Sequence, residues 1–406
     1  MTEPTALVLA TLDTKGAEAA HLAAAIRRAG VRALVLDLSV FGPPQTPADI
    51  AREEVAWAAS ADLERLRALP RSEALAVMAE GATAIARRLL ASGRLHGLAG
   101  LGGSQGTVAG TRVMAAMPYG LPKLMVSTMA SGNTRPYVGT ADITMHFPVV
   151  DLSGLNRFCR AALENAGRAI AGMAREWRPA QAAPRAEEVA MTMFGSTTPC
   201  VTRVAEGLRE RGAEPVTFHA NGVGGRALEE WLAGGEFSAV LDLTTTELAD
   251  ALVGGHRSAG PDRLEAAGRR GVPQVVAPGA LDMVNFGPRD TVPPAFTGRL
   301  MYCHNPGTTL MRTTREENER LGQWMADKLN RACGPVGVAL PLRGFSAYDV
   351  AGGPFFDPES DAAFAGALRA GLKPGIRVVE VDAHINDPAF ADAALDLYER
   401  VRAGDA

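Results

Sequence analysis

Apolar runs and polar breaks alternate regularly at the start of the chain. The run ALVLATLD (residues 6–13) predicts a buried strand, an alanine-rich stretch from about Ala17 to Ala29 predicts a helix that ends at Gly30, and VRALVLDLS (31–39) predicts a second strand. Two buried strands joined by a helix are typical of a parallel βαβ unit.

A polar and mostly helical segment follows to about Leu90, and two more apolar runs come after it. LHGLAGLGG (95–103) runs into glycines, with a helix starting near Thr107, and LPKLMVST (121–128) predicts another buried strand. Strands that alternate with helices in this way predict a doubly wound, mainly parallel sheet of the Rossmann-like kind.

The pattern stops at Trp177–Pro184, where two prolines, small residues and charges without apolar periodicity indicate a linker. Afterwards EVAMTMFGSTTP (188–199), AEPVTFHA (213–220), FSAVLDLTTTELA (237–249) and GVPQVVAPGALDM (271–283) repeat the order of the first half. We therefore predict two related domains, an N-terminal nucleotide-binding domain over residues 1–178 and a C-terminal domain over 186–406. Both are expected to be α/β and doubly wound, with a ligand cleft between them at the carboxyl ends of their strands.

Length and composition agree with this prediction. The chain has 406 residues, more than the roughly 250–300 at which a single core stops growing. A net charge of −4 without any cluster of Lys and Arg argues against binding to nucleic acid or to an anionic membrane. The chain shows neither a signal peptide nor a membrane-spanning apolar run, so we expect a cytoplasmic protein that binds small molecules.

Four cysteines, Cys159, Cys200, Cys303 and Cys333, are scattered without any CxxC pair. This spacing favours neither a zinc site nor a disulfide framework, and we predict buried free thiols.

The glycine-rich segment GLAGLGGSQGT (97–107) is the strongest local signal. Its glycines can adopt positive φ at the end of a strand, and free N–H groups and hydroxyls at the following helix start would form an anion site. No lysine follows the last glycine, and GxGxxG is not in frame, so the segment matches neither standard phosphate loop. Glycines that serve only close packing are the alternative. The candidate residues are Gly102, Gly103, Ser104, Gln105, Gly106 and Thr107.

Two further loops follow predicted strands. TLDTKG (11–16) offers Thr11, Asp13, Thr14 and Lys15, and VSTMASGN (126–133) offers Ser127, Thr128 and Ser131. Asp13 could order Lys15 or hold Mg²⁺ through water, or Asp13 or Thr14 could cap a helix.

Two lysines and two aspartates in this half of the chain are additional candidates. Lys15 and Lys123 are two of only four lysines, and each stands beside a predicted strand end, where it could meet phosphate or simply lie on the surface. Asp142 and Asp151 stand among apolar residues and are predicted to be buried, either as structural anchors or as site residues.

Long motifs across essentially the whole chain resemble one known family. They are ATLDTKGAE (10–18), GLGGSQGT (100–107), PKLMVSTMASGN (122–133), YVGTADITM (137–145), VVDLSGLN (149–156), VNFG (284–287), HNPGTTLMRTT (304–314), PLRGFSAYD (341–349) and EVDAHINDPAF (380–390). The family is named for the ATP-binding domain of the tomato mosaic virus resistance protein, and its bacterial members are largely of unassigned activity. The resemblance implies ATP bound by an N-terminal subdomain, a second Rossmann-like subdomain and a homodimer. It places nucleotide contacts at residues 11–15, 102–107 and 127–131.

The second half holds the other candidates for chemistry. His304 and Arg312 lie in a segment that we expect to be irregular, and Asp382 and His384 follow the strand VVEV. At D-x-H spacing on extended chain, Asp382 and His384 would point to one side, as an acid/base pair or a metal pair requires. The histidines could equally be structural. HExxH spacing is absent, so no metal is assigned.

Arg312 and Arg343 complete this group of candidates. A guanidinium can hold a carboxylate or phosphate through two parallel hydrogen bonds, or it can simply pair with a surface acid. The sequence does not distinguish these roles.

Three functional hypotheses stay open. The first is an ATP-binding enzyme, with or without Mg²⁺, that acts on a small anionic metabolite near His304, Arg312, Arg343 and His384 by phosphoryl transfer or ligation. The second is a nucleotide-independent hydrolase or C–C-cleaving enzyme on an organic acid, with Asp382 and His384 as acid and base. The third is a non-catalytic nucleotide-binding module that works with a partner.

Overall fold

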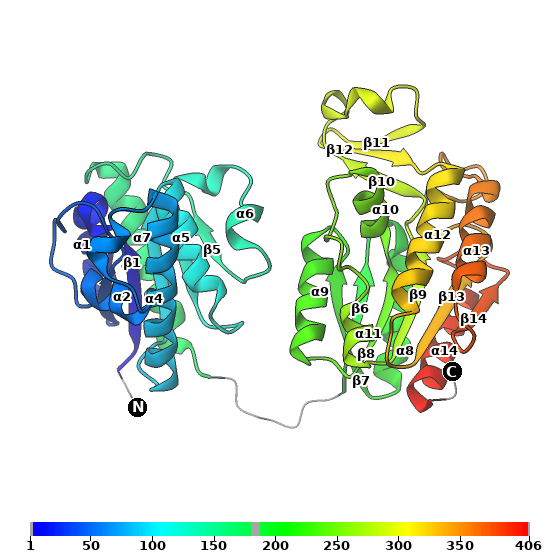
Figure 1. Ribbon diagram of the computed structural model, residues 1–406, viewed down its shortest axis with the longest axis horizontal. Coiled ribbons are helices and arrows are strands. Elements are labelled where there is room, and N and C mark those ends of the chain that lie inside the picture. The colour runs from blue at the N-terminus through cyan, green and yellow to red at the C-terminus, as the bar shows by residue number, and fades with distance from the viewer. Residues whose placement is uncertain (1–2, 180–186, 405–406) are drawn as a thin grey trace. The chain divides into compact units, whose positions relative to one another are not determined.

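The computed structural model describes residues 3–179 and 187–404, and the chain divides into two compact units, residues 1–181 and 182–406 (Figure 1). The predicted linker at 177–184 falls mostly on residues 180–186, which lie outside the described residues. Each unit is an α/β domain built on its own parallel sheet, as the apolar pattern predicts.

The sheet of the N-terminal unit has the order β2-β1-β3-β4-β5, and every neighbouring pair is parallel. Its strands are β1 (Thr5–Ala10), β2 (Arg32–Asp37), β3 (Gly97–Gly102), β4 (Lys123–Ser127) and β5 (Thr144–His146). The chain order reverses beside β1, because β2 lies on one side of it and β3 on the other. In open α/β sheets, ligands bind outside the carboxyl ends of the strands at this switch point.

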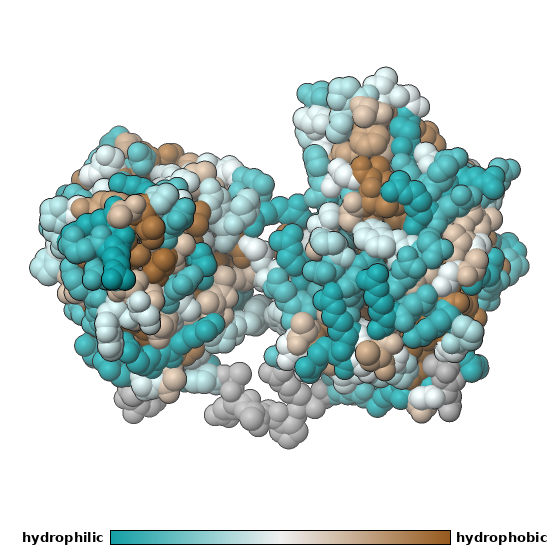
Figure 2. Space-filling model, in the orientation of Figure 1, coloured by the Kyte–Doolittle hydropathy of each residue, from teal (hydrophilic) through white to brown (hydrophobic). Residues whose placement is uncertain are grey.

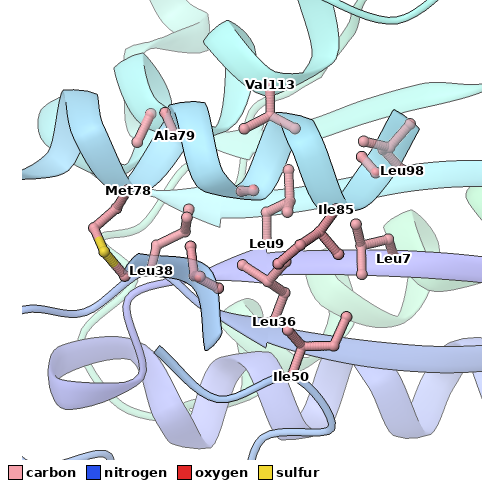
Figure 3. Packing of buried hydrophobic residues seen from close by; sticks show 14 of the residues in the cluster. Leu7, Leu9, Leu36, Leu38, Ile50, Met78, Ala79, Ile85, Leu98 and Val113 are labelled. Carbon is pink, nitrogen blue, oxygen red and sulfur yellow. The ribbon is translucent and has the colours of Figure 1, made fainter. Parts of the chain in front are cut away.

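Helices cover both faces of this sheet, because successive strand residues point to opposite sides. Leu7 and Leu9 of β1 pack toward α2 and α4, whereas Ala6 and Val8 pack toward α1 and α7. Figure 3 shows the first face, where leucines of β1, β2 and β3 lie in one cluster with Met78, Ala79 and Ile85 of α4. The helices of this unit are α1 (Leu12–Arg28), α2 (Arg52–Ala58), α3 (Leu63–Leu66), α4 (Arg71–Ala91), α5 (Ser104–Ala115), α6 (Arg135–Val138) and α7 (Arg157–Glu176).

Helix α1 begins at Leu12, earlier than the predicted start near Ala17. The buried Asp37 carboxylate accepts the Leu12 N–H at 3.1 Å, which supplies a partner for one of the free N–H groups of the first turn. TLDTKG is therefore mostly the first turn of a helix, with a non-helical kink at Lys15 (φ −127°), and not a loop.

The sheet of the C-terminal unit has the order β14-β13-β9-β8-β6-β7, again parallel throughout. Its strands are β6 (Glu187–Met193), β7 (Ala213–His219), β8 (Ala239–Thr244), β9 (Gln274–Gly279), β13 (Val336–Pro341) and β14 (Arg377–Val381). Counted from its own first strand, this sheet has the same order as the N-terminal sheet with one strand added. The switch point lies between β6 and β8.

Helices also cover both faces of the second sheet. α8 (Thr198–Glu210) and α14 (Pro388–Ala403) pack against one face. The other face is covered by α9 (Val223–Gly234), α10 (Thr246–Val253), α11 (Ala266–Arg270), α12 (Arg315–Leu329) and α13 (Pro358–Gly371).

Between β9 and β13 the chain forms a small antiparallel sheet that the pattern does not predict. It has the order β10-β12-β11, with β10 (Met283–Phe286), β11 (Met301–Asn305) and β12 (Thr308–Arg312), drawn in yellow and yellow-green in Figure 1. The segment around His304, predicted to be irregular, is thus a β-hairpin that turns at Pro306 and Gly307. The visible surfaces of both units are mainly hydrophilic, with scattered hydrophobic areas (Figure 2).

The cysteine prediction is half right. All four thiols are free, and Cys159 and Cys200 are buried, but Cys303 and Cys333 are exposed. Cys303 lies on the edge strand β11, and Cys333 follows the end of α12. Among the described residues, none of the helices combines the length and the hydrophobicity needed to cross a membrane.

Candidate functional site

The three predicted loops of the N-terminal unit meet at the carboxyl edge of its sheet. Gly102, the last residue of β3, pairs in register with Ser127, the last residue of β4. On the other side Leu9 pairs with Gly100, so continuing this register brings Thr11 level with Gly102. Adjacent strands lie about 4.8 Å apart, so the three segments form one continuous edge at the switch point.

Helix α5 begins at this edge without a side-chain cap. Its N-cap residue is Gly103, and Ser104 and Gln105 in its first turn are exposed. An uncapped helix presents free backbone N–H groups and the positive end of the helix dipole, which together favour an anion. The Thr128 hydroxyl lies nearby, 3.9 Å from the position that a Cβ on Gly103 would take.

Gly102 and Gly103 do not have the positive φ that the sequence suggests. Gly102 is needed for close packing instead, because a Cβ there would lie 2.8 Å from the Cα of Gly106 and 3.3 Å from the N of Thr107. At Gly103 (φ −79°) nothing except the Thr128 hydroxyl comes within 4 Å of a Cβ. The first glycine therefore positions α5 on β3, and the second leaves space in front of the helix.

Two of the predicted contact residues face the interior. The Thr107 and Ser127 hydroxyls lie 2.6 Å apart, and both residues are fully buried. Thr107 also donates to the Gly103 carbonyl at 2.8 Å, and Ser127 accepts from the Met129 N–H at 3.0 Å. These two hydroxyls fix the loops after β3 and β4 relative to each other. Among the predicted serines, Ser104 and Ser131 are the exposed ones.

The N-terminus of α1 differs from that of α5 because the protein already covers it. Besides the contact from Asp37, the Gly42 N–H donates to Asp13 Oδ2 at 3.2 Å, and the Gln45 side chain donates to the Asp13 carbonyl at 2.8 Å. Thr11 and Thr14 share a hydrogen bond of 3.1 Å between their hydroxyls, and Thr14 is exposed. Asp13 thus anchors the loop after β2 and does not order Lys15.

Both lysines donate to backbone carbonyls. Lys15 Nζ donates to the carbonyl of Leu152. Lys123 is buried at the start of β4, the opposite edge from the site, where its ammonium binds two carbonyls and the Asp142 carboxylate. The suggestion that Lys123 meets phosphate is therefore wrong, and Asp142 is a structural anchor. Neither Asp142 nor Asp151 is buried, contrary to prediction, because both lie on surface segments.

In the C-terminal unit, Asp382 and His384 do not form a pair. Asp382 is exposed and binds Arg343 through two hydrogen bonds of 2.7 and 2.8 Å. The His384 ring is buried, with Nε2 2.9 Å from the Ser346 carbonyl and Nδ1 accepting from the Asn386 N–H at 3.1 Å. The chain bends after β14, so the two side chains face different surroundings, and both ring nitrogens of His384 are engaged.

Arg312 is buried and its donors are taken by the protein. Its guanidinium donates to the carbonyls of Phe355, Asp282 and Asp357, to the Thr313 hydroxyl and to the Asp361 carboxylate. Burial and the nearby Asp349 raise the pKa of Asp282 and of Asp361. This cluster is a structural ion network and leaves Arg312 no free donor for a ligand.

His304 is the predicted residue of this half that lines an open pocket, with a volume of about 290 Å³. The pocket lies at the carboxyl ends of β6 and β7, next to the β11–β12 hairpin. Sequence reasoning did not single out its other polar members. They are Ser196, His219, Arg257, Thr308 and Tyr348. Ser196 and His219 lie at the ends of two strand segments that repeat the order of the first half. A comparison of the strand ends in the two halves would have singled them out.

The carboxylates and histidines of the described residues do not gather into a metal site of the protein's own. Among the described residues, no cluster of three or more His, Cys, Asp or Glu side chains is suitable for a metal. Asp13 Oδ1 is buried without a hydrogen-bond partner, so this carboxylate has one oxygen that could face a cation.

Comparison with other sequences gives a consistent match over the whole chain. The N-terminal domain of an uncharacterised protein family, UPF0261, matches residues 4–179, and its C-terminal domain matches residues 186–401. A UPF0261 protein of Clostridium tetani is 44% identical over 389 residues, 95% of this chain and 96% of that protein. The ToMV resistance protein Tm-1(GCR237) of Solanum lycopersicum is 43% identical over 310 residues, 75% of this chain and 41% of the tomato protein. The resemblance drawn from the motifs is confirmed.

Likeness to solved structures is distant. A putative UDP-N-acetylglucosamine 2-epimerase from Listeria monocytogenes aligns with 100% of this chain and 98% of its own, at 12% identity and a TM-score of 0.22. Likeness at this level supports no statement about ligand or reaction.

Proposed function

Because the chain belongs to the uncharacterised protein family UPF0261, whose name assigns no activity, we propose a function from its site: the N-terminal unit binds ATP. The phosphates lie against the start of α5, and Ser104, Gln105 and the Thr128 hydroxyl surround them. Thr11 and the exposed Thr14, at the start of α1, lie one strand away.

The open start of α5 at the switch point is the observation that carries this proposal. Helix α1 emerges from the neighbouring strand, but its first turn already has the negative charge of Asp37 as a partner. A second anion is therefore accepted more readily by α5, where no carboxylate competes. ATP is favoured among phosphate compounds because the motifs at this edge resemble an ATP-binding family.

The proposal concerns the binding of ATP and assigns no reaction. The hypothesis of a nucleotide-independent enzyme that uses Asp382 and His384 receives no support from their geometry, since each is committed to other partners. ATP-dependent transfer or ligation, and a nucleotide-binding module that serves a partner, are separated by an assay for ADP or AMP formed over hours. The homodimer that the resemblance implies stays a prediction, to be checked by light scattering.

Calorimetric titration with ATP, in the presence and absence of Mg²⁺, tests the proposal with two variants of one residue. Gly103→Ala adds a methyl group where the structure has space, and Gly103→Asp adds a carboxylate at the same point. We expect saturable micromolar binding to the natural protein, near-normal binding to Gly103→Ala, and at least tenfold weaker binding to Gly103→Asp.

Comparing Gly103→Ala with Gly103→Asp distinguishes an effect of the added charge from an effect on folding. If Gly103→Asp bound ATP as tightly as Gly103→Ala, the anion would not lie at α5. If well-folded natural protein showed no binding at millimolar ATP, the proposed function would be wrong.

A further inference from the structure

The pocket at His304 belongs to the C-terminal unit alone, so it is a separate site from the α5 edge. Its volume of about 290 Å³ is at the lower end of the roughly 300–1,000 Å³ of ligand pockets. A small metabolite fits such a space better than a whole nucleotide.

The charge of the pocket is one-sided. Its lining includes Arg257 and two histidines, His219 and His304, and contains no Asp or Glu, in a chain with a net charge of −4. The Arg257 guanidinium lies 4.9 Å from the centre of the Phe194 ring, and the His219 ring stacks on Phe194 at 5.5 Å. Burial and Arg257 lower the pKa of His219, so Arg257 carries the positive charge of the lining and His219 offers a neutral hydrogen-bonding ring. A lining with a guanidinium and without a carboxylate favours an anion.

The pocket also contains a polar atom that the protein leaves unused. Ser196 is 5% exposed, and its Oγ has no hydrogen-bond partner. The backbone of Ser196 is held firmly, because its carbonyl accepts from the Ala347 N–H at 3.0 Å and from the Asn386 side chain at 2.9 Å. An unpaired buried hydroxyl costs about 1–3 kcal/mol, a cost that a ligand hydrogen bond would remove.

On the hairpin side, His304 forms a pair with Tyr348. Nδ1 of His304 lies 2.8 Å from the Tyr348 hydroxyl, and Nε2 of the same ring has no hydrogen bond to any part of the chain that the structure describes. Tyr348 also packs against Phe355 and Tyr302, which fixes the phenol. The free ring nitrogen is thus a donor or acceptor that the hairpin positions at the pocket.

We propose that this pocket binds a small organic carboxylate: Arg257 and His219 hold the carboxylate, Ser196 hydrogen-bonds the ligand, and His304, oriented by Tyr348, contacts its polar end. The apolar part of the ligand lies on Phe194 and Leu310. A carboxylate on an organic body is favoured over inorganic phosphate because part of the lining is apolar.

The test follows histidine ring signals by NMR in the full-length protein while probes are added. The probes are benzoate, succinate, inorganic phosphate and benzamide, which has the shape of benzoate without its charge. We expect a carboxylate to shift the His304 and His219 signals saturably and benzamide to bind at least tenfold more weakly. The buried His384 signal is the internal control.

Two variants sharpen the test. Arg257→Gln should weaken carboxylate binding at least tenfold. Ser196→Ala removes a hydroxyl that has no partner, so it should leave folding intact while it weakens binding several-fold. Gly103→Asp, in the other unit, should leave this titration unchanged, so failure here and failure of ATP binding are distinguishable.

Three results would overturn the proposal: no carboxylate shifts either signal, benzamide binds as tightly as benzoate, or Arg257→Gln binds as tightly as the natural protein. Shifts caused by phosphate alone would assign the pocket to inorganic anions and would equally overturn the assignment to an organic carboxylate.

Discussion

The switch points of the two sheets have the same topology and opposite chemistry. In the N-terminal unit, β3 ends at Gly102, and α5 follows from its N-cap Gly103 without a side-chain cap. In the C-terminal unit, the equivalent strand β8 contains the buried Asp242, which binds the fully buried Arg263 through both carboxylate oxygens. At the N-terminal switch point a helix starts without a side-chain cap, whereas the space beside β8 is filled by a buried ion network of the protein itself.

The Arg263 network shows how the second edge is closed. The guanidinium of Arg263 also donates to Glu247 at 2.7 Å and to Glu229 at 3.3 Å. Glu247 in turn accepts the N–H groups of Gly222 and Gly225 at the start of α9. A helix start that already has a carboxylate partner does not attract another anion. The start of α9 is thereby satisfied from within the protein, whereas the start of α5 has no carboxylate partner.

The largest effect is expected for Arg263→Met. The change leaves Asp242 and Glu247 as buried charges without their cation, and breaking such a network typically costs about 3–5 kcal/mol. Urea unfolding followed by hydrogen exchange should show the C-terminal unit strongly destabilised and the N-terminal unit unchanged. Arg203→Met, which removes an exposed ion pair with Asp392, is the control and should change little. Equal stability of the two variants would contradict the closed-edge interpretation.

A second effect concerns pH and Asp250. Burial raises the pKa of this carboxyl to about 7, above the value of about 3.9 in an unfolded chain. The native state then holds an extra proton between these values, so stability should fall with rising pH from about 4 to 7, by up to about 1.4 kcal/mol per pH unit, and level off above pH 7.

Asp250→Asn should remove the contribution of Asp250 to this slope. The substitution is sterically matched, since the Asn285 amide, whose Oδ1 has no partner, can rotate to accept from the new side chain. Urea unfolding at pH 5, 6, 7 and 8 compares the two proteins. An equally steep pH dependence in the variant would show that Asp250 does not carry the extra proton.

A third prediction separates the two glycines of the open edge. Gly102→Ala places a methyl group against Gly106, and overpacking of this kind costs about 1–3 kcal/mol. Gly103→Ala meets no backbone and should be close to neutral. Thermal unfolding of both variants checks this order, and the reverse order would contradict the assignment of Gly102 to packing.

The smallest effect is a labelling difference between the units. Cys303 and Cys333 are exposed, whereas Cys159 is buried and burial raises the pKa of Cys200 to about 12. A thiol reagent should therefore modify two cysteines of the folded protein, both in the C-terminal unit. Mass spectrometry of the labelled peptides checks the sites, and rapid labelling of Cys159 would indicate that the N-terminal unit opens.

The sequence was most informative where a property depends on neighbours along the chain. The βαβ order, the two repeated halves and the three N-terminal edge segments follow from local apolar periodicity and from glycine and hydroxyl residues at strand ends. The segment around His304 was predicted to be irregular, and the hairpin formed by β11 and β12 was missed.

What the sequence could not decide was the partner of each polar side chain. His384, Arg312 and Lys123 are residue types that suit a site, yet each is bound by partners that include a group far along the chain: Ser346 for His384, Phe355 for Arg312 and Asp142 for Lys123. His219, Arg257 and Ser196 come from separate segments and meet His304 only in the folded unit.

The sequence by itself determined the α/β class, the repeated strand order and the family, because periodicity and motifs depend only on residues close together along the chain. The tertiary structure alone decided which helix start stays open and which histidine keeps a free nitrogen. The physical reason is that a polar group is available to a ligand only when no other part of the chain satisfies it, and this depends on contacts between residues far apart in sequence.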